Sequence, residues 1–209
     1  MVVTVGTAKL RRIIHVADAE KAAGGKQLIE EARSSPTAFV QLYRRHYDAI
    51  FRYCVHRLFD RHRAEDVTSQ IFLKVVENLD RFKGDERRFR NWLYRIATNA
   101  VNHHLRNAAR RKALLRLVCE KASSQRVNCT GASDDKLAVL REAVLSLKPR
   151  YQTIIALRFF ENLKLTEIAE VLGSSDGTIR SQLARALAKL RKVLAAESPK
   201  RPEVIKNEQ

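Results

Sequence analysis

Apolar residues return every three or four positions along most of the chain, which is the spacing that lines one face of an α-helix. Only seven glycines and four prolines interrupt the 209 residues, so the pattern predicts an all-α protein. The periodicity weakens in residues 1–34, 113–134 and 196–209, where we expect a loosely ordered N-terminal extension, a flexible linker and a polar tail. The chain is therefore expected to form two small helical domains, residues 35–112 and 135–195.

The first domain is expected to contain three helices. Ser35-Pro36 is an N-cap followed by a proline at the first helical position. An apolar stripe runs from about residue 63 to 79, and a third helix runs from Phe89 to about Lys112. Between them, the segment DRFKGDERRF at residues 80–89 breaks the periodicity at Lys83-Gly84-Asp85. This segment is predicted to be a basic loop.

The second domain contains the pattern of a helix-turn-helix. After an Asp134-Asp135 cap and a helix restarted by Pro149, Thr166 is expected to cap a short helix. Gly173 would supply a left-handed exit from that helix, and Ser175 would cap the next one. Two helices joined by so short a turn form a helix-turn-helix.

The final helix has an apolar face and a slim basic face. At about 100° per residue, Ile179, Leu183, Leu187, Leu190 and Leu194 gather on one side, while Ser181, Arg185, Ala188 and Lys192 lie opposite. Small side chains suit an element that enters a major groove, and basic side chains near the helix N-terminus are placed to reach base edges. The outward face is therefore predicted to bind DNA.

Composition indicates the same kind of partner. The chain has 40 Lys and Arg against 23 Asp and Glu, a formal net charge of +17. An excess of this size indicates a polyanion, either nucleic acid or an acidic membrane surface. One basic helix face alone is as often a solvated surface. The turn, the slim face and the charge together favour DNA.

Other site chemistry is sparse. Cys54, Cys119 and Cys129 form no CxxC pair, and their odd number favours reduced thiols in a cytoplasmic protein. No apolar run reaches membrane-spanning length, and the first residues lack the order of a signal peptide, so no membrane insertion is expected. The histidines show no metal spacing, and neither a phosphate-binding glycine loop nor a nucleophile elbow occurs. The sequence therefore predicts no cofactor, no metal and no enzymatic activity.

Three segments, in this order, resemble the extracytoplasmic-function sigma factors of bacterial RNA polymerase. AEDVTSQIFLKVVENLDRF is similar to the family's polymerase-clamp segment, and FKGDERRFRNWLYRIATNAVNHHLR is similar to its promoter-melting segment. LKPRYQTIIALRFFENLKLTEIAEVLGSSDGTIRSQLARALAKLRKVL is similar to its promoter-upstream domain. The resemblance covers about residues 36–112 and 135–195, and a linker too short for a third domain also fits. It implies a sigma factor that binds core RNA polymerase, melts the minus-ten element of promoter DNA and recognises the minus-thirty-five element.

The resemblance also implies roles for individual positions. Asp66, Ser69 and Gln70 would contact the clamp helices of the large polymerase subunit, although Ser69-Gln70 replaces the family's usual Gln-Glu pair and loses a carboxylate. The minus-ten set, which would receive a flipped base and follow the non-template strand, is Phe82, Lys83, Gly84, Asp85, Arg87, Arg88, Arg90 and Asn99. The minus-thirty-five set is Thr178, Arg180, Ser181, Ala184, Arg185 and Lys192, with the phosphate role of Lys192 resting on helix geometry alone.

Some interpretations stay open. Phe82 fits either a base-binding loop or the core, whereas Trp92 is interpreted as core. A free-standing helix-turn-helix regulator would explain the second domain, but no dimerisation stripe is evident. A nuclease would explain the charge, but it needs clustered acids or histidines that the sequence lacks. The sequence leaves open whether an anti-sigma factor is a further partner.

Overall fold

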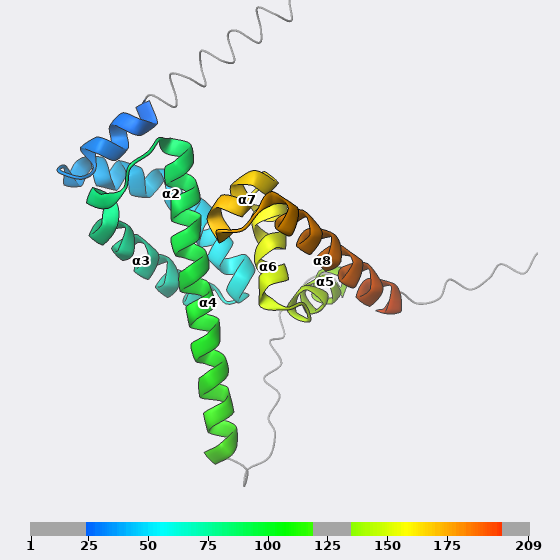
Figure 1. The fold of residues 1–209 in the computed structure, drawn as a ribbon. Helices are drawn as coiled ribbons and strands as arrows, with labels where there is room; N and C mark the ends of the chain where they lie inside the picture. Colours follow the sequence, from blue (N-terminus) through cyan, green and yellow to red (C-terminus); the bar gives the residue numbers. More distant parts are fainter. Residues whose placement is uncertain (1–23, 119–134, 198–209) are drawn as a thin grey trace, which may run out of the picture.

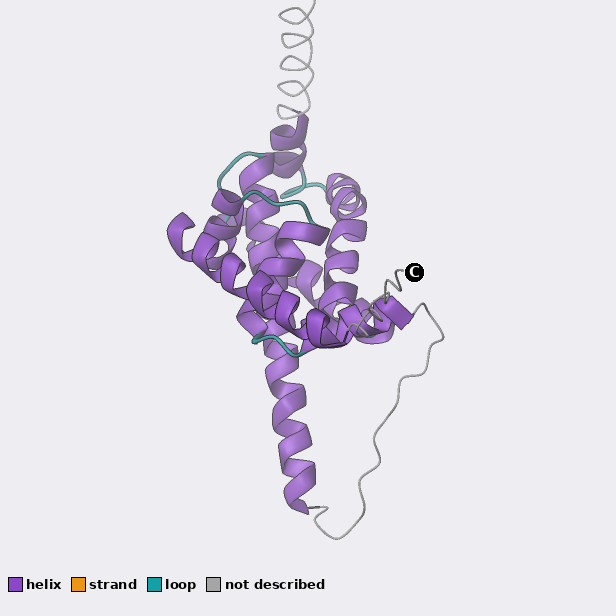
Figure 2. Cartoon of the chain, turned by 90° about the vertical axis from the view of Figure 1, so that its right-hand side faces the viewer, coloured by secondary structure: helices purple, strands orange, loops and turns teal. Residues whose placement is uncertain are grey.

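The computed structural model of the chain describes residues 24–118 and 135–197, and these residues form helices and short turns with no strand (Figures 1 and 2). The first domain contains a helix at residues 24–31, α2 (Pro36–Leu58), α3 (Arg61–Asn78), the 3-10 turn η1 (Leu79–Arg81) and α4 (Glu86–Val118). The second contains α5 (Asp135–Leu145), α6 (Pro149–Ile155), the π turn η2 (Ala156–Phe160), α7 (Leu165–Leu172) and α8 (Asp176–Glu197). The predicted all-α class is confirmed.

Side-chain caps fix where the first-domain helices begin. Ser35 Oγ accepts a hydrogen bond from the Ala38 amide at 3.4 Å, as the sequence predicts for the start of α2. Asp85 Oδ1 accepts a hydrogen bond from the Arg88 amide at 2.8 Å. Because Asp85 caps α4, this helix begins at Glu86, three residues before the predicted Phe89.

The helix α4 is also longer than predicted at its C-terminal end. It continues through Val118, although the sequence predicts a linker from residue 113. Residues 108–118 are rich in Ala, Leu, Arg and Lys, which favour helix even without an apolar stripe. Leu114 and Leu115 are exposed, and this end of α4 projects from the first domain as a single rod (Figures 1 and 2). The rest of the predicted linker lies outside the described residues.

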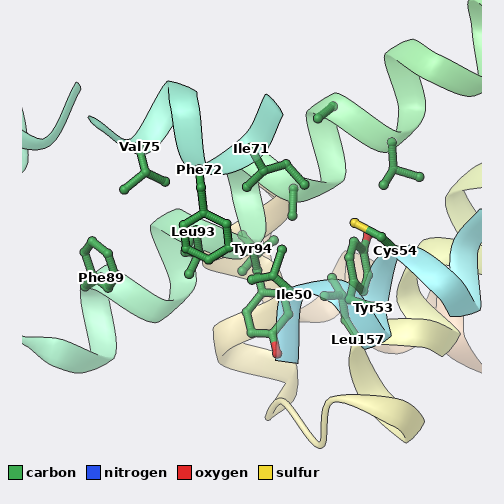
Figure 3. Close-up of a cluster of buried hydrophobic side chains, with 14 of the residues drawn as sticks. Ile50, Tyr53, Cys54, Ile71, Phe72, Val75, Phe89, Leu93, Tyr94 and Leu157 are labelled. Atoms are coloured by element: carbon green, nitrogen blue, oxygen red, sulfur yellow. The ribbon is translucent and has the colours of Figure 1, made fainter. Parts of the chain in front are cut away.

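The inward faces of α2, α3 and α4 build the core of the first domain. Figure 3 shows Ile50, Tyr53 and Cys54 of α2 in one cluster with Ile71 of α3 and Leu93 of α4. Burial raises the pKa of the Cys54 thiol to about 11, so this cysteine is an unreactive core residue. Cys119 and Cys129 lie outside the described residues.

Part of the N-terminal extension packs against this core. Residues 24–31 are helical, and Ile29 and Ala32 are buried in the first-domain cluster. Arg33 Nη2 donates a hydrogen bond to the Phe82 carbonyl at 2.6 Å. The prediction of a loosely ordered segment is therefore wrong for residues 24–34, because two apolar side chains with no clear periodicity anchor them. Residues 1–23 lie outside the described residues.

The second domain packs α5, α6 and α8 around a small core of its own, Ala143, Leu147, Tyr151, Ile155, Ala186 and Leu190. The helix α6 begins at Pro149, as predicted. The helix α7 begins at Leu165, so the predicted Thr166 cap is wrong. The Glu167 carboxylate stabilises the start of α7 from inside the first turn, because its Oε2 accepts a hydrogen bond from the Lys164 amide at 2.8 Å.

The turn between α7 and α8 has the predicted chemistry. Gly173 adopts a left-handed conformation with φ of 62°, and its amide donates to the Ala169 carbonyl. Ser175 Oγ then accepts a hydrogen bond from the Thr178 amide at 3.3 Å and caps α8. The predicted helix-turn-helix is confirmed.

The two domains are docked on one another. Leu157 and Ile168 of the second domain belong to the same buried cluster as Tyr53 of the first, and Figure 3 shows Leu157 with Tyr53 in that cluster. Arg57 Nη1 donates a hydrogen bond to Gln152 Oε1 at 2.8 Å between buried side chains of the two domains. The interface therefore combines apolar packing with paired polar groups.

Candidate nucleic-acid interface

The outer face of α8 is presented to solvent. Ile179 and Ala186 are fully buried and fix the inner side of α8 on the rest of the protein. The predicted minus-thirty-five residues, which we call the reader face, are all exposed: Thr178, Arg180, Ser181, Ala184, Arg185 and Lys192. In residues 24–118 and 135–197, neither arginine of this face forms an ion pair. Both guanidinium groups are therefore available to an external anion.

Hydroxyl groups order the first turn of this reader face. The Ser175 and Thr178 hydroxyl oxygens lie 2.9 Å apart, and Ser181 Oγ donates a hydrogen bond to the Thr178 carbonyl at 3.2 Å. These hydrogen bonds cap the first turn of α8 and hold it in one conformation. Precise contact with base edges requires such a rigid element.

Phe82 is a core residue whose edge borders the predicted minus-ten loop. Only 8% of its surface is exposed, and its ring centroid lies 5.4 Å from that of Phe89 and 5.1 Å from that of Trp92. The sequence leaves open whether Phe82 belongs to the core or forms a free base-stacking platform, and the structure favours the core. Trp92 is only partly buried, so its assignment to the core holds for one side of the ring.

Gly84 and Asp85 shape this loop. A Cβ atom on Gly84 would lie 2.9 Å from Arg88 Cβ and 3.0 Å from Phe82 Cζ, so the loop passes closely over both side chains. Asp85 caps α4, as described above, which gives it a structural role besides the predicted one.

An open cavity of about 450 Å³ lies beside this loop, lined by Lys74, Asn78, Arg81, Phe82, Lys83, Trp92 and Ile96. Arg88, Trp92 and Asn99 share one side of α4 with Ile96 because they follow helical spacing, and we call this side the open face of α4. Both Arg88 and Asn99 are exposed there. An aromatic wall surrounded by cations is suited to one unstacked base and its flanking phosphates.

Sequence reasoning missed three lining residues of this cavity, Lys74, Asn78 and Arg81. They precede the loop and belong to α3 and η1, so their separation in sequence from Trp92 hid their proximity. The available signal was the recurrence of polar side chains at spacings of three and four, which places them on one helix face.

A second side of α4 is covered by α7. Arg90 Nη2 forms an ion pair with Glu167 Oε1, and Arg87 Nη2 lies 3.2 Å from Glu170 Oε1. Asn91 Nδ2 donates a hydrogen bond to Glu170 Oε2 at 2.6 Å. We call this side, with Tyr94 one turn further on, the docked face of α4. Of the predicted minus-ten residues on α4, Arg88 and Asn99 therefore lie on the open face, whereas Arg87 and Arg90 lie on the docked face.

A third acidic side chain of the second domain completes these contacts. Glu161 follows the π turn, and its side chain is 1% exposed. Its Oε2 accepts a hydrogen bond from the Tyr94 hydroxyl at 2.7 Å and lies 3.7 Å from Arg52 Nη2. Burial raises the pKa of Glu161, although the hydrogen bond from Tyr94 and the charge of Arg52 oppose this effect.

The predicted polymerase-binding residues lie on the outer face of α3. Asp66, Ser69 and Gln70 are exposed, as the sequence predicts for a docking face. Leu73 and Val76 continue this face at helical spacing and are 60% and 51% exposed. Sequence reasoning missed both, because aliphatic residues on an amphipathic helix are normally interpreted as core.

No metal centre is evident in the described part of the chain, where no group of three or more His, Cys, Asp or Glu side chains could hold an ion. None of the described helices is both long enough and apolar enough to span a membrane.

Comparison with known proteins gives a consistent result along the chain. The Sigma-70 region 2 family model matches residues 42–111, and the Sigma-70 region 4 model matches residues 137–190. The RNA polymerase sigma-H factor of Pseudomonas aeruginosa is 30% identical over 81% of this chain and 93% of its own length. The ECF RNA polymerase sigma factor SigW of Bacillus subtilis is 28% identical over 81% of this chain and 95% of its own. The ECF RNA polymerase sigma factor BldN of Streptomyces coelicolor is 30% identical over 80% of this chain. The match covers only 65% of the length of BldN.

Solved structures share the fold. CnrH, solved in complex with the cytosolic domain of CnrY, matches with a TM-score of 0.62 and 25% identity, covering 83% of this chain and 99% of CnrH. The sigma factor RpoE of Bartonella quintana, solved with the anti-sigma factor NepR, matches with a TM-score of 0.56 and 19% identity over 76% of this chain and 98% of RpoE.

Proposed function

The chain belongs to the extracytoplasmic-function sigma factors of the sigma-70 family, and we propose that it binds core RNA polymerase and directs it to promoters through minus-ten melting and minus-thirty-five recognition. It acts in the cytoplasm, where polymerase and chromosomal DNA meet. We assign no catalytic step to the chain, because RNA synthesis belongs to the polymerase. An anti-sigma factor is a further partner that we propose, because RpoE of Bartonella quintana was solved in complex with the anti-sigma factor NepR.

One observation carries the proposal: the free basic face of α8 occurs in the same chain as the open aromatic and basic cavity beside α4. A helix-turn-helix alone would support duplex recognition. A cavity able to take a single base supports binding of separated strands. The two features together favour a protein that both captures a promoter and holds its melted form.

The reader face supports recognition of the minus-thirty-five element. Arg180 and Arg185 are exposed near the capped N-terminal end of α8, where an arginine can donate two hydrogen bonds to the O6 and N7 atoms of guanine. Ala184 between them leaves the backbone free to approach the groove. Lys192 lies two turns beyond Arg185, so a phosphate contact suits it better than a base contact.

The open face of α4 supports the melting step. Trp92 and the edge of Phe82 supply an apolar wall for an unstacked base, and the Asn78 amide can both donate and accept hydrogen bonds at its edge. Lys74, Arg81 and Lys83 surround this space with charges that suit phosphates.

The outer face of α3 supports polymerase binding. Leu73 and Val76 expose apolar surface that a partner would remove from water, and Asp66 adds a carboxylate that suits a basic groove. We expect Asp66→Arg to reduce association with core polymerase and leave the helical circular dichroism spectrum unchanged. Unaltered holoenzyme formation would remove this assignment.

The main alternative is a free-standing helix-turn-helix regulator, which would bind its sites without polymerase. Run-off transcription on genomic fragments distinguishes the two functions. With core polymerase present, the protein is expected to direct transcripts from defined start sites, and without it the protein should show little sequence preference. Sequence-specific binding by the protein alone, with no new transcripts in the presence of core polymerase, would favour the regulator.

A further inference from the structure

The N-terminal segment holds the first residue of the loop between η1 and α4, which consists of residues 82–85. Arg33 Nη2 donates a hydrogen bond to the Phe82 carbonyl at 2.6 Å, and the Phe82 amide donates to the Leu79 carbonyl at 3.1 Å. Both backbone polar groups of Phe82 are therefore paired, so the peptide plane that joins Phe82 to Lys83 has a fixed orientation. Because Lys83 lines the open cavity beside α4, this peptide plane helps to set the shape of the cavity.

Arg33 is well placed for this contact. It lies in the turn between the helix at residues 24–31 and α2, directly after the buried Ala32. Within residues 24–118 and 135–197, no carboxylate forms an ion pair with Arg33, and its guanidinium group donates to the Phe82 carbonyl instead. A hydrogen bond from a charged donor is stronger than one between neutral groups.

The same N-terminal helix, shown in blue in Figure 1, also contacts the residue that follows the loop. The helix passes so close to Glu86 that a Cβ atom on Gly25 would collide with the Glu86 carboxylate. Glu86 Oε1 also forms an ion pair with Arg45 Nη2 of α2 at 2.7 Å. The N-terminal segment therefore contacts the chain at both ends of the loop.

The position of the loop affects the wall of the cavity. Phe82 and Trp92 line the cavity together, with ring centroids 5.1 Å apart, and Gly84 passes closely over Phe82 Cζ. A binding site needs its side chains held to within about 0.5 Å by residues outside the site. A contact that fixes the Phe82 backbone can therefore assist base binding without touching nucleic acid.

We propose that Arg33 is a positioning residue for promoter melting: it holds the Phe82 peptide so that the loop and the cavity keep the shape that receives an unstacked base. The proposal rests on the proposed function, because a base enters this cavity only if the chain melts a promoter. The competing role for an exposed arginine is a direct contact with a DNA phosphate. The two roles differ in salt dependence, because only a phosphate contact contributes to counterion release.

Two substitutions of Arg33 and one control separate these roles. Arg33→Met keeps an apolar stem but has no donor for the Phe82 carbonyl, whereas Arg33→Lys keeps a charged donor. The control is Arg44→Met, which removes one positive charge from an exposed position of α2 in the same domain. Because Arg33 and Arg44 are both exposed, all three variants should fold, and circular dichroism verifies this.

The first readout needs neither DNA nor polymerase, because Trp92 is the only tryptophan of the chain and lines the cavity. Arg33→Met should shift the fluorescence emission of Trp92 to longer wavelength and increase its quenching by acrylamide. The physical reason is that the Phe82 ring, which lies against the indole, is no longer held in one position. Arg33→Lys and Arg44→Met should give the wild-type spectrum. A wild-type spectrum from Arg33→Met would overturn the proposal.

The second readout is the rate of promoter opening by holoenzyme at saturating concentration, followed by permanganate reactivity of the minus-ten thymines. Arg33→Met should open the promoter about three- to tenfold more slowly than the wild type, since one hydrogen bond no longer holds the loop. Arg33→Lys should recover most of this rate, and Arg44→Met should open the promoter at the wild-type rate. Normal opening by Arg33→Met would overturn the positioning role.

The salt dependence of promoter binding tests the competing role. Arg33→Met should have the same salt slope as the wild type. A slope lower by about one unit for Arg33→Met, with no such change for Arg44→Met, would assign Arg33 to a DNA phosphate and overturn the proposal.

Failure of the proposed function gives a different result. If the wild-type holoenzyme opens no promoter, the proposed function fails and the melting role of Arg33 fails with it, even where the Trp92 spectrum shows that Arg33 holds the loop. If the wild type opens promoters and Arg33→Met matches it in both readouts, the proposed function stands and the positioning role fails.

Discussion

The reader face of α8 and the N-terminal half of α4 are both basic, but their side chains are committed differently. On α8, the arginines point to solvent and have no acidic partner among the described residues. On α4, Asp85 is a cap, and Arg87 and Arg90 are paired with carboxylates of the second domain. Charge alone therefore predicts a DNA-binding surface on α8, whereas on α4 the contacts of each side chain decide which residues are free.

This difference predicts that substitutions in the two regions change different quantities. An arginine of the reader face should affect DNA binding and leave stability unchanged, because neither Arg180 nor Arg185 forms an ion pair within the described residues. A residue at the N-terminal end of α4 should instead affect stability or the docking of the two domains.

Replacement of Phe82 by alanine should have the largest effect. The ring is buried between Phe89 and Trp92, so Phe82→Ala should lower the free energy of unfolding by about 3–5 kcal/mol. Urea unfolding followed by circular dichroism measures this change, and Phe82→Leu should recover part of the loss. A stability close to that of the wild type, together with defective promoter melting, would instead identify Phe82 as a base-stacking residue.

His46 couples the stability of the first domain to pH. Burial lowers the pKa of His46 to about 4 from an ordinary 6.5, with Arg45 and Arg90 adding to the effect, and its ring lies 5.3 Å from that of Phe89. Between these pH values His46 is therefore protonated in the unfolded chain and neutral in the folded chain. Stability should be complete above pH 6.5 and decrease as pH falls, by about 2 kcal/mol between pH 7 and pH 5.

Urea unfolding of His46→Phe at the same pH values provides the control. This variant has no group to titrate at that position, so its stability should change less than that of the wild type over this interval. An identical dependence on pH in the two proteins would show that another group is responsible.

Arg185→Ala should reduce binding to the upstream element by about 1–3 kcal/mol and flatten the preference at one or two base pairs. The free energy of unfolding should not change. Lys192→Ala is the matched comparison, because it should weaken all sequences equally and lower the salt slope by about one unit. Holoenzyme binding to a library of upstream elements at several salt concentrations measures both. A uniform loss for Arg185→Ala would make this face a general electrostatic contact.

Asp85→Ala should lower the free energy of unfolding by about 1 kcal/mol, because the Arg88 amide loses its cap. Asp85→Asn should retain most of the stability, since asparagine caps helices equally well. Thermal unfolding measures both changes. If Asp85→Asn and Asp85→Ala are equally stable and equally defective in promoter opening, the carboxylate acts on DNA instead of on the helix.

Much of the fold could be predicted from the sequence. Helical periodicity, the Ser35 cap and the Gly173 exit gave the all-α class and the helix-turn-helix, because these signals depend on local geometry. The ends of α4 could not be predicted. Its start depends on the Asp85 cap inside a basic segment, and its last turns have helix-forming residues without an apolar stripe.

The candidate site residues also fall into two groups, those that local patterns predict and those that depend on contacts between distant segments. The exposure of Arg180, Arg185 and Asp66 follows from periodicity on single helices, although their roles in binding stay predictions. The contacts of Glu167 and Glu170 with α4 could not be predicted, because their partners lie on a helix some eighty positions earlier in the chain. Pairings of this kind depend on how the domains dock, which no local pattern specifies.

We infer that α8 captures the promoter and that the open face of α4 holds its melted strand. Permanganate footprinting of thymines in the minus-ten element tests it most directly, with holoenzymes assembled from Arg185→Ala and from Asn99→Ala at concentrations that saturate the promoter. We predict that promoter bound by the Arg185→Ala holoenzyme melts as in the wild type, whereas promoter bound by the Asn99→Ala holoenzyme shows reduced thymine reactivity. Normal reactivity with Asn99→Ala, or loss of reactivity on promoter saturated with Arg185→Ala, would contradict this division of roles.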